Sequence, residues 1–183
     1  MAKNPFGEFL RRPGLGETFP PIPSPTPGIS LPPTKPRVFI VHGHNLGILA
    51  QVEVFVLKAN RKSVVLKDQS RPGKTLLDEL VQLSRGVQFA IVILSADDVG
   101  RGKNEPDDQL RYRGRQNAVF EFGFLIQQLG RVRVFVLHEQ GVEMPSDYGG
   151  VIYIPYDTNG AWKVLLAKAV KAAGIPINVS SVI

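Results

Sequence analysis

Residues 37–60 read "RVFIVHGHNLGILAQVEVFVLKAN", and this stretch contains the pattern that repeats along the rest of the domain. Its first part, 37–43, is a short apolar run that predicts a buried strand, and 46–59 repeats apolar residues at helical spacing. The pattern then recurs, with strands expected at 63–68, 89–95, 132–137 and 151–156 and helices at 75–84, 116–129 and 161–173. Because the strands are apolar enough to be covered on both faces, we expect an α/β domain whose five-stranded parallel sheet is doubly wound by helices.

The first 36 residues differ in composition from the rest, since they contain ten of the fifteen prolines. Such a segment lacks hydrogen-bond donors and any periodic apolar face, so disorder or polyproline II is its natural state. We expect residues 1–36 to be a linker or tail, and residues 37–183 to form one domain. A spacer role is favoured over a ligand for a partner.

Composition excludes several classes of function. The absence of cysteine removes disulfides, thiol nucleophiles and Cys-type zinc sites. No apolar run reaches the length of a membrane span and no signal peptide is evident, so a cytoplasmic location is expected. The formal charge is +6 on 183 residues. This excess is too dilute to favour direct binding of nucleic acid.

In an open parallel sheet, ligands gather beyond the carboxyl ends of the strands. Those ends are expected at 42–45, 68–74 and 95–98. The candidate binding residues there are His42, Gly43, His44, Arg71, Ser95 and Asp98. We expect no metal, because His138 is the only other histidine and no Asp-His pair completes a cluster.

Two nearby patterns have simpler explanations. "GKT" at 73–75 resembles part of a P-loop, but Asp68 stands where the first glycine of that motif belongs. Thr75 and Asp78 instead fit a capping box, although Lys74 and the free amides could still face a phosphate. The segment 100–114 carries mixed charges and is expected to be a solvated, mobile loop that could cover a site.

Glu121 is the only charged residue between Arg115 and Arg131. Helical geometry places it at the border of the apolar stripe, with Asn117 one turn earlier on the same row. A border glutamate often just reaches solvent. A carboxylate among phenylalanines can also serve in catalysis, and these residues alone leave both interpretations open.

The stretches "RVFIVHGHN", "ILSADDVG", "RQNAVFEFG" and "MPSDYGGVIYIPYD" give the chain a resemblance to the TIR-like predicted nucleotide-binding family. That family includes TIR-like effector domains of bacterial cyclic-nucleotide anti-phage systems, some fused to STING domains. The resemblance implies a flavodoxin-like, TIR-like fold. It also implies that Glu121 cleaves NAD at the nicotinamide–ribose bond, that Asn117 lines the pocket, and that His44 lies in a pocket loop.

The resemblance implies that NAD is the substrate and that no separate cofactor is needed. We recognise no sensor domain after residue 174, so activation is expected through self-assembly or a sensor protein. Two alternatives stay open: a non-catalytic TIR-like interaction module, and cleavage of the N-glycosidic bond of another nucleotide. Hydrolysis and cyclisation are not separated by the sequence.

Overall fold

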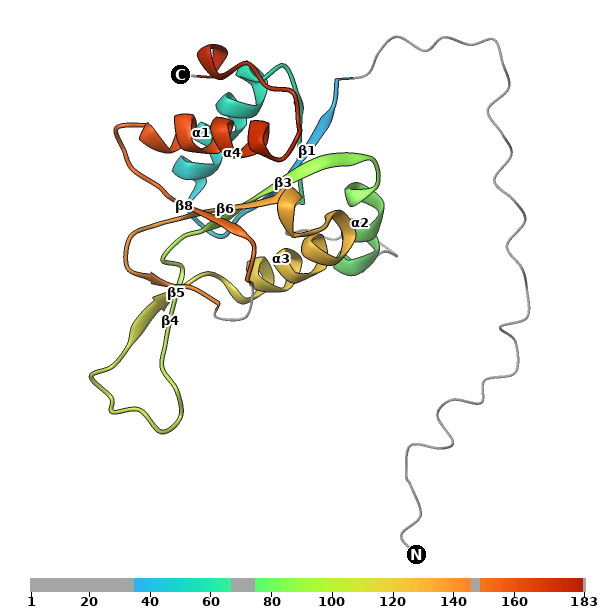
Figure 1. Ribbon diagram of the computed structural model, residues 1–183. Coiled ribbons are helices and arrows are strands. Elements are labelled where there is room, and N and C mark those ends of the chain that lie inside the picture. The colour runs from blue at the N-terminus through green and yellow to red at the C-terminus, as the bar shows by residue number, and fades with distance from the viewer. Residues whose placement is uncertain (1–34, 67–74, 146–148, 183) are drawn as a thin grey trace, which may run out of the picture. The chain divides into compact units, whose positions relative to one another are not determined.

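The central sheet has five parallel strands. The computed structural model describes residues 35–66, 75–145 and 149–182. In space the strands follow the order β2-β1-β3-β6-β8 (Figure 1). Their bounds are β1 Arg37–Val41, β2 Lys62–Val65, β3 Val87–Leu94, β6 Val134–His138 and β8 Ile152–Pro155. The predicted five-stranded parallel sheet is therefore confirmed, and β1 begins at the residue where the domain was expected to start.

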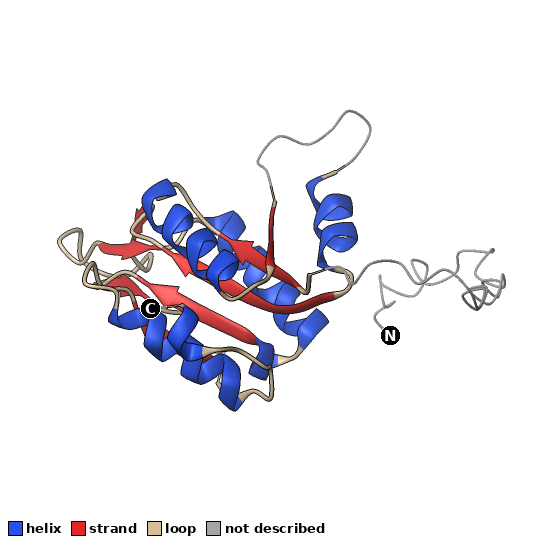
Figure 2. Cartoon of the chain, turned by 90° about the horizontal axis from the view of Figure 1, so that it is seen from above, coloured by secondary structure: helices blue, strands red, loops and turns tan. Residues whose placement is uncertain are grey.

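The sheet is buried on both faces. Successive strand side chains point to opposite faces, and helices pack against each face. Val38 and Ile40 belong to one core, together with residues of α1 (Leu46–Lys58) and α4 (Ala161–Ala172). Phe39 and Val41 belong to the other core, with residues of α2 (Leu76–Ser84) and α3 (Gln116–Leu129). Figure 2 shows helices on both sides of the strands. The doubly wound arrangement is as predicted.

The start of α2 shows the role of Thr75, which is the only described residue of the "GKT" stretch. The Thr75 hydroxyl accepts from the Asp78 amide at 3.1 Å, and the Asp78 carboxylate accepts from the Thr75 amide at 3.0 Å. These reciprocal bonds form the predicted capping box. Residues 67–74, which include Arg71 and Lys74, lie outside the described residues.

A second, three-stranded sheet was not predicted. Its strands are β4 (Asp98–Gly100), β5 (Arg111–Arg113) and β7 (Val142–Glu143), in the order β4-β5-β7. The prediction that 100–114 is a mobile loop was therefore wrong at both ends, which pair as an antiparallel hairpin that projects from the body (Figure 1). The physical reason is long-range, since Glu143 accepts hydrogen bonds from both Arg111 and Arg113.

Short 3-10 turns at Arg131–Arg133 and Val179–Ser181 complete the secondary structure of the described residues. Within the same residues, no helix is both long enough and apolar enough to cross a membrane.

Candidate functional site

The loop after β1 contains three of the predicted site residues. Because β1 ends at Val41 and α1 begins at Leu46, His42 and His44 lie in the loop between them. His42 is half-buried, with Nδ1 2.6 Å from the Gly43 carbonyl oxygen. His44 is exposed, and its backbone amide donates to Asp97 Oδ1 at 3.0 Å.

Ser95, at the end of β3, is turned inward. Its side chain is 1% exposed, and its hydroxyl donates to Asp97 Oδ2 at 2.8 Å. The structure thus places Ser95 beneath a carboxylate rather than toward solvent. Asp97 stood in the quoted "ILSADDVG" stretch, but its contact with the loop after β1 was not foreseen.

Glu139 joins the same group of strand ends. Its Oε1 atom accepts from Asn45 Nδ2 at 3.0 Å, and its Oε2 atom accepts from the Ala96 amide at 2.9 Å. No local sequence signal identifies Glu139, because these two partners are 94 and 43 residues away along the chain. Parallel strands bring their carboxyl ends to one edge, and the contact arises only there.

Glu121 is more deeply buried than its helical angle indicated. It lies on α3 and is 8% exposed, on the same face as the fully buried Phe122 and Leu125. The interpretation in which Glu121 simply reaches solvent does not fit this burial. Asn117, one turn earlier, is exposed. A carboxylate buried to this degree is costly unless it is paired or hydrogen-bonded, and buried carboxylates are frequent at functional sites.

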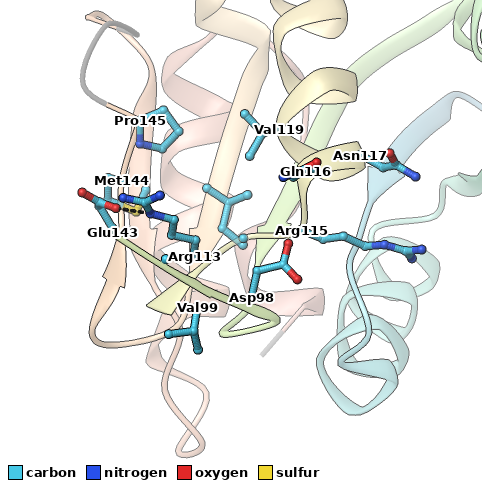
Figure 3. Close-up of a pocket in the computed structure, with 13 residues that line it drawn as sticks. Asp98, Val99, Arg113, Arg115, Gln116, Asn117, Val119, Glu143, Met144 and Pro145 are labelled. Carbon is cyan, nitrogen blue, oxygen red and sulfur yellow. Dashed lines mark hydrogen bonds and ion pairs between the residues drawn. The ribbon is translucent and has the colours of Figure 1, made fainter. Parts of the chain in front are cut away.

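A cavity of about 1020 Å³ lies where the start of α3 faces the three-stranded sheet (Figure 3). Asp98 and Asn117 are the predicted site residues that line it, and Arg113 and Glu143 meet at its wall. The side chain of Asn117 points away from that pair. The lining comprises Leu94, Asp98, Val99, Gly100, Arg113, Gly114, Arg115, Gln116, Asn117, Val119, Glu143, Met144 and Pro145.

The other predicted residues are not part of this lining. Glu121 lies one helical turn beyond Asn117, and the residues of the loop after β1 and Ser95 form the separate hydrogen-bonded group described above. Arg71 lies outside the described residues. The structure therefore gives two adjacent groups at the carboxyl edge of the sheet, with Asn117 and Glu121 on successive turns of the same helix.

The wall formed by the small sheet is electrostatically paired. Hydrogen bonds from Arg113 and Arg111 hold the pKa of Glu143 below its ordinary value. Backbone donation from Gly102, followed by the Arg111 guanidinium, lowers the pKa of Glu105. These carboxylates stay ionised near neutral pH; Glu143 fixes the hairpin to β7, and Glu105 connects residues within the hairpin. They are already neutralised by arginine and offer little free charge to a ligand.

No group of three or more His, Asp or Glu residues that could hold a metal occurs within 35–66, 75–145 and 149–182. The three histidines are half-buried or exposed, and the Nδ1 atoms of His42 and His138 lie near backbone carbonyls.

Comparison with known proteins identifies the family. A profile described as "CAP12/Pycsar effector protein, TIR domain" matches residues 37–158. The chain belongs to this family. The match covers the whole central sheet and both groups of residues at its edge, so it agrees with the TIR-like fold expected from the sequence.

Three relatives show how this TIR domain compares with longer proteins. It is 33% identical over 154 residues to "Uncharacterized protein YuaY" of Escherichia coli K12, which covers 84% of the chain and 50% of the relative. It is 33% identical over 129 residues to "Protein tirC" of Dictyostelium discoideum, covering 66% and 64%. It is 26% identical over 140 residues to "CD-NTase-associated protein 12" of Lachnospiraceae bacterium RUG226, covering 76% and 42%. The chain therefore spans between 42% and 64% of the length of these relatives.

Proposed function

We propose that this TIR domain cleaves the nicotinamide–ribose bond of NAD as part of an effector of bacterial anti-phage defence, with Glu121 as the catalytic residue. The observation that carries the proposal is the burial of Glu121, 8% exposed on an apolar helix face, at the position where the resemblance places the catalytic glutamate. Membership of the CAP12/Pycsar effector family supports the defence context.

One carboxylate is sufficient for this reaction. Glycoside hydrolysis ordinarily needs a second carboxyl group, because an alcohol leaves poorly without a proton. Nicotinamide in NAD is a cationic pyridinium, and it departs as a neutral molecule when the bond to the ribose carbon breaks. The remaining task is to stabilise the positive charge that develops on the ribose, which an ionised glutamate does best where water is excluded.

The other predicted residues receive binding roles. Asn117 stands one turn before Glu121 and lines the cavity, so it is suited to orient a ribose hydroxyl near the carboxylate. Asp98 lines the same cavity. His42, Gly43 and His44 would contact the substrate from the loop after β1. NAD enters as substrate, and water or a nitrogen of its own adenine would take the place of nicotinamide.

The test is release of free nicotinamide from NAD, followed by chromatography. Glu121→Gln keeps the size of the side chain and removes its charge, so nicotinamide release should fall by at least about 100-fold while the fold is retained. Glu53→Gln is the matched control, because Glu53 lies on α1, against the opposite core, and its carboxylate accepts from Ser63 at 3.3 Å. Full activity of a folded Glu121→Gln protein would rule out the catalytic assignment.

We also propose that activity is controlled by assembly, either of this domain with itself or with a sensor protein. The hairpin beside the cavity exposes three large apolar side chains: Val99 is 57% exposed, Leu110 58% and Tyr112 56%. Such a group on a projecting hairpin is typical of a contact surface. The same observation supports the alternative of a non-catalytic interaction module, which would bind partners through the hairpin and release no nicotinamide.

A further inference from the structure

Asp97 connects the end of β3 to the loop after β1. Its Oδ1 atom accepts from the His44 amide at 3.0 Å, and its Oδ2 atom accepts from the Ser95 hydroxyl at 2.8 Å. The carboxylate occupies the space that a side chain at position 43 would need, since a Cβ on Gly43 would lie 1.7 Å from Oδ2. Any side chain at 43 would therefore displace this carboxylate, and glycine leaves room for it.

Glu139 makes a second connection from the end of β6. Its two oxygens accept from Asn45 Nδ2 and from the Ala96 amide, at 3.0 and 2.9 Å. Asn45 is held at both ends, because its own Oδ1 atom accepts from the Ile48 amide at 3.1 Å and thereby caps α1. The loop from residue 42 to residue 45 is thus tied to the segments that follow β3 and β6 and to the first turn of α1.

All four oxygens of the two carboxylates are engaged in this way. Each accepts a hydrogen bond from a backbone amide or a polar side chain, and both residues are half-buried. A carboxylate with such partners holds a backbone in place, because charge-assisted hydrogen bonds are short and strongly directional.

We propose that Asp97 and Glu139 are positioning residues, which fix the loop after β1 at the carboxyl edge of the sheet so that it meets the substrate in one conformation. The inference rests on the proposed function, because that function assigns the loop to substrate binding. Neither carboxylate needs to touch the substrate. A displacement of about 1 Å in a group that orients a substrate lowers turnover by about 100-fold, so the effect should be large even at a distance from the reacting bond.

The experiment compares three variants. Asp97→Ala removes both acceptors, whereas Asp97→Asn keeps one acceptor for the His44 amide and a polar group beside Ser95. Asp157→Ala is the control: Asp157 also accepts from two amides, of Ala161 and Trp162, at 3.1 and 2.9 Å, but it follows β8 and caps the start of α4. All three proteins are assayed for nicotinamide release, thermal unfolding and amide hydrogen exchange at His44.

We expect Asp97→Ala to lower kcat/KM by about 10- to 100-fold and to accelerate exchange at His44, and Asp97→Asn to restore most of both. Asp157→Ala should unfold at a lower temperature yet keep the activity of the wild type in its folded fraction. Equal losses of activity in Asp97→Ala and Asp157→Ala, tracking stability alone, would overturn the proposal.

The exchange measurement separates this proposal from the proposed function. If the wild-type domain releases no nicotinamide, the proposed function fails, and exchange at His44 still decides whether Asp97 holds the loop. Unchanged exchange at His44 in Asp97→Ala overturns the positioning role, whatever the activity.

Discussion

Replacement of Gly43 by alanine directly tests how tightly the Asp97 carboxylate packs against the loop after β1. The new Cβ would lie 1.7 Å from Asp97 Oδ2 and 2.6 Å from Asp97 Cγ, so the carboxylate must retreat by more than about 1 Å. That movement breaks the bonds to the His44 amide and the Ser95 hydroxyl. The alternative, a shift of the backbone at 43, would disturb the end of β1, where Val41 is fully buried.

The magnitude follows from those two bonds and the crowding. Hydrogen bonds to a charged group contribute about 1.5 to 3 kcal/mol each, and overpacking costs about 1 to 3 kcal/mol. Because a half-buried carboxylate recovers part of this by hydration, we expect a net loss of about 3 kcal/mol. For a domain of this size, such a loss lowers Tm by about 6 to 12 °C.

Thermal unfolding of a double-mutant cycle provides the assay. In an Asp97→Ala background the clash is gone, so Gly43→Ala should cost much less than it does in the wild type. Gly149→Ala is the control, because among the described residues no heavy atom lies within 4 Å of a Cβ there, and its Tm should stay near that of the wild type. Additive effects of the changes at 43 and 97, or a Tm drop below about 2 °C for Gly43→Ala, would show that the Asp97 carboxylate does not restrict position 43.

Three further outcomes are expected. In chemical denaturation, Phe122→Ala should lower the free energy of unfolding by about 3 to 5 kcal/mol, because this side chain of α3 is fully buried. Phe120→Ala, on the exposed face of the same helix, should change it by less than about 0.5 kcal/mol. Glu143 has a depressed pKa in the folded domain, so its contribution is present above its unfolded value near 4.5 and is lost as the pH falls through the lower folded value. Between about pH 5 and pH 3 the Tm of Glu143→Gln should therefore fall less than that of the wild type, and the difference should shrink in high salt because the carboxylate is partly exposed. Nicotinamide release per molecule should decrease on dilution, and a flat profile from a protein that is monomeric by light scattering throughout would contradict control by assembly.

The central sheet was predictable because its information is local. Each buried strand is a short apolar run next to a segment with helical periodicity. Both patterns can be recognised in the sequence without knowing what the strand contacts. The small sheet lacked this signal, since β4 and β7 are three and two residues long and are held by pairing of Arg111 and Arg113 with Glu143. The charged residues of 100–114 were predicted to be solvated, but Arg111 and Arg113 form hydrogen bonds that hold the small sheet together.

The position of the candidate site in the fold was predictable from the sequence, but the burial and the contacts of its residues were not. The sequence placed its residues at the carboxyl ends of strands, and the structure brings His44, Ser95 and Asn117 to that edge. Helical periodicity gave the direction of Glu121 around its axis but not its depth, which depends on how α3 packs against the sheet. Glu139 was missed because its partners become neighbours only when β1, β3 and β6 lie side by side.

The strand order also affects how the chain is made. β1 pairs with β3 as well as β2, so Phe39 lies opposite Ala90 and Ile40 opposite Ile91. During synthesis, at about 5 to 20 residues per second, β1 and β2 leave the ribosome on the order of seconds before β3 is complete. Over that interval an apolar strand with one unpaired edge is open to aggregation or to a chaperone. The strand order β2-β1-β3-β6-β8 brings the loops after β1, β3 and β6 to one edge of the sheet. The same order leaves β1 incompletely buried until β3 has been made.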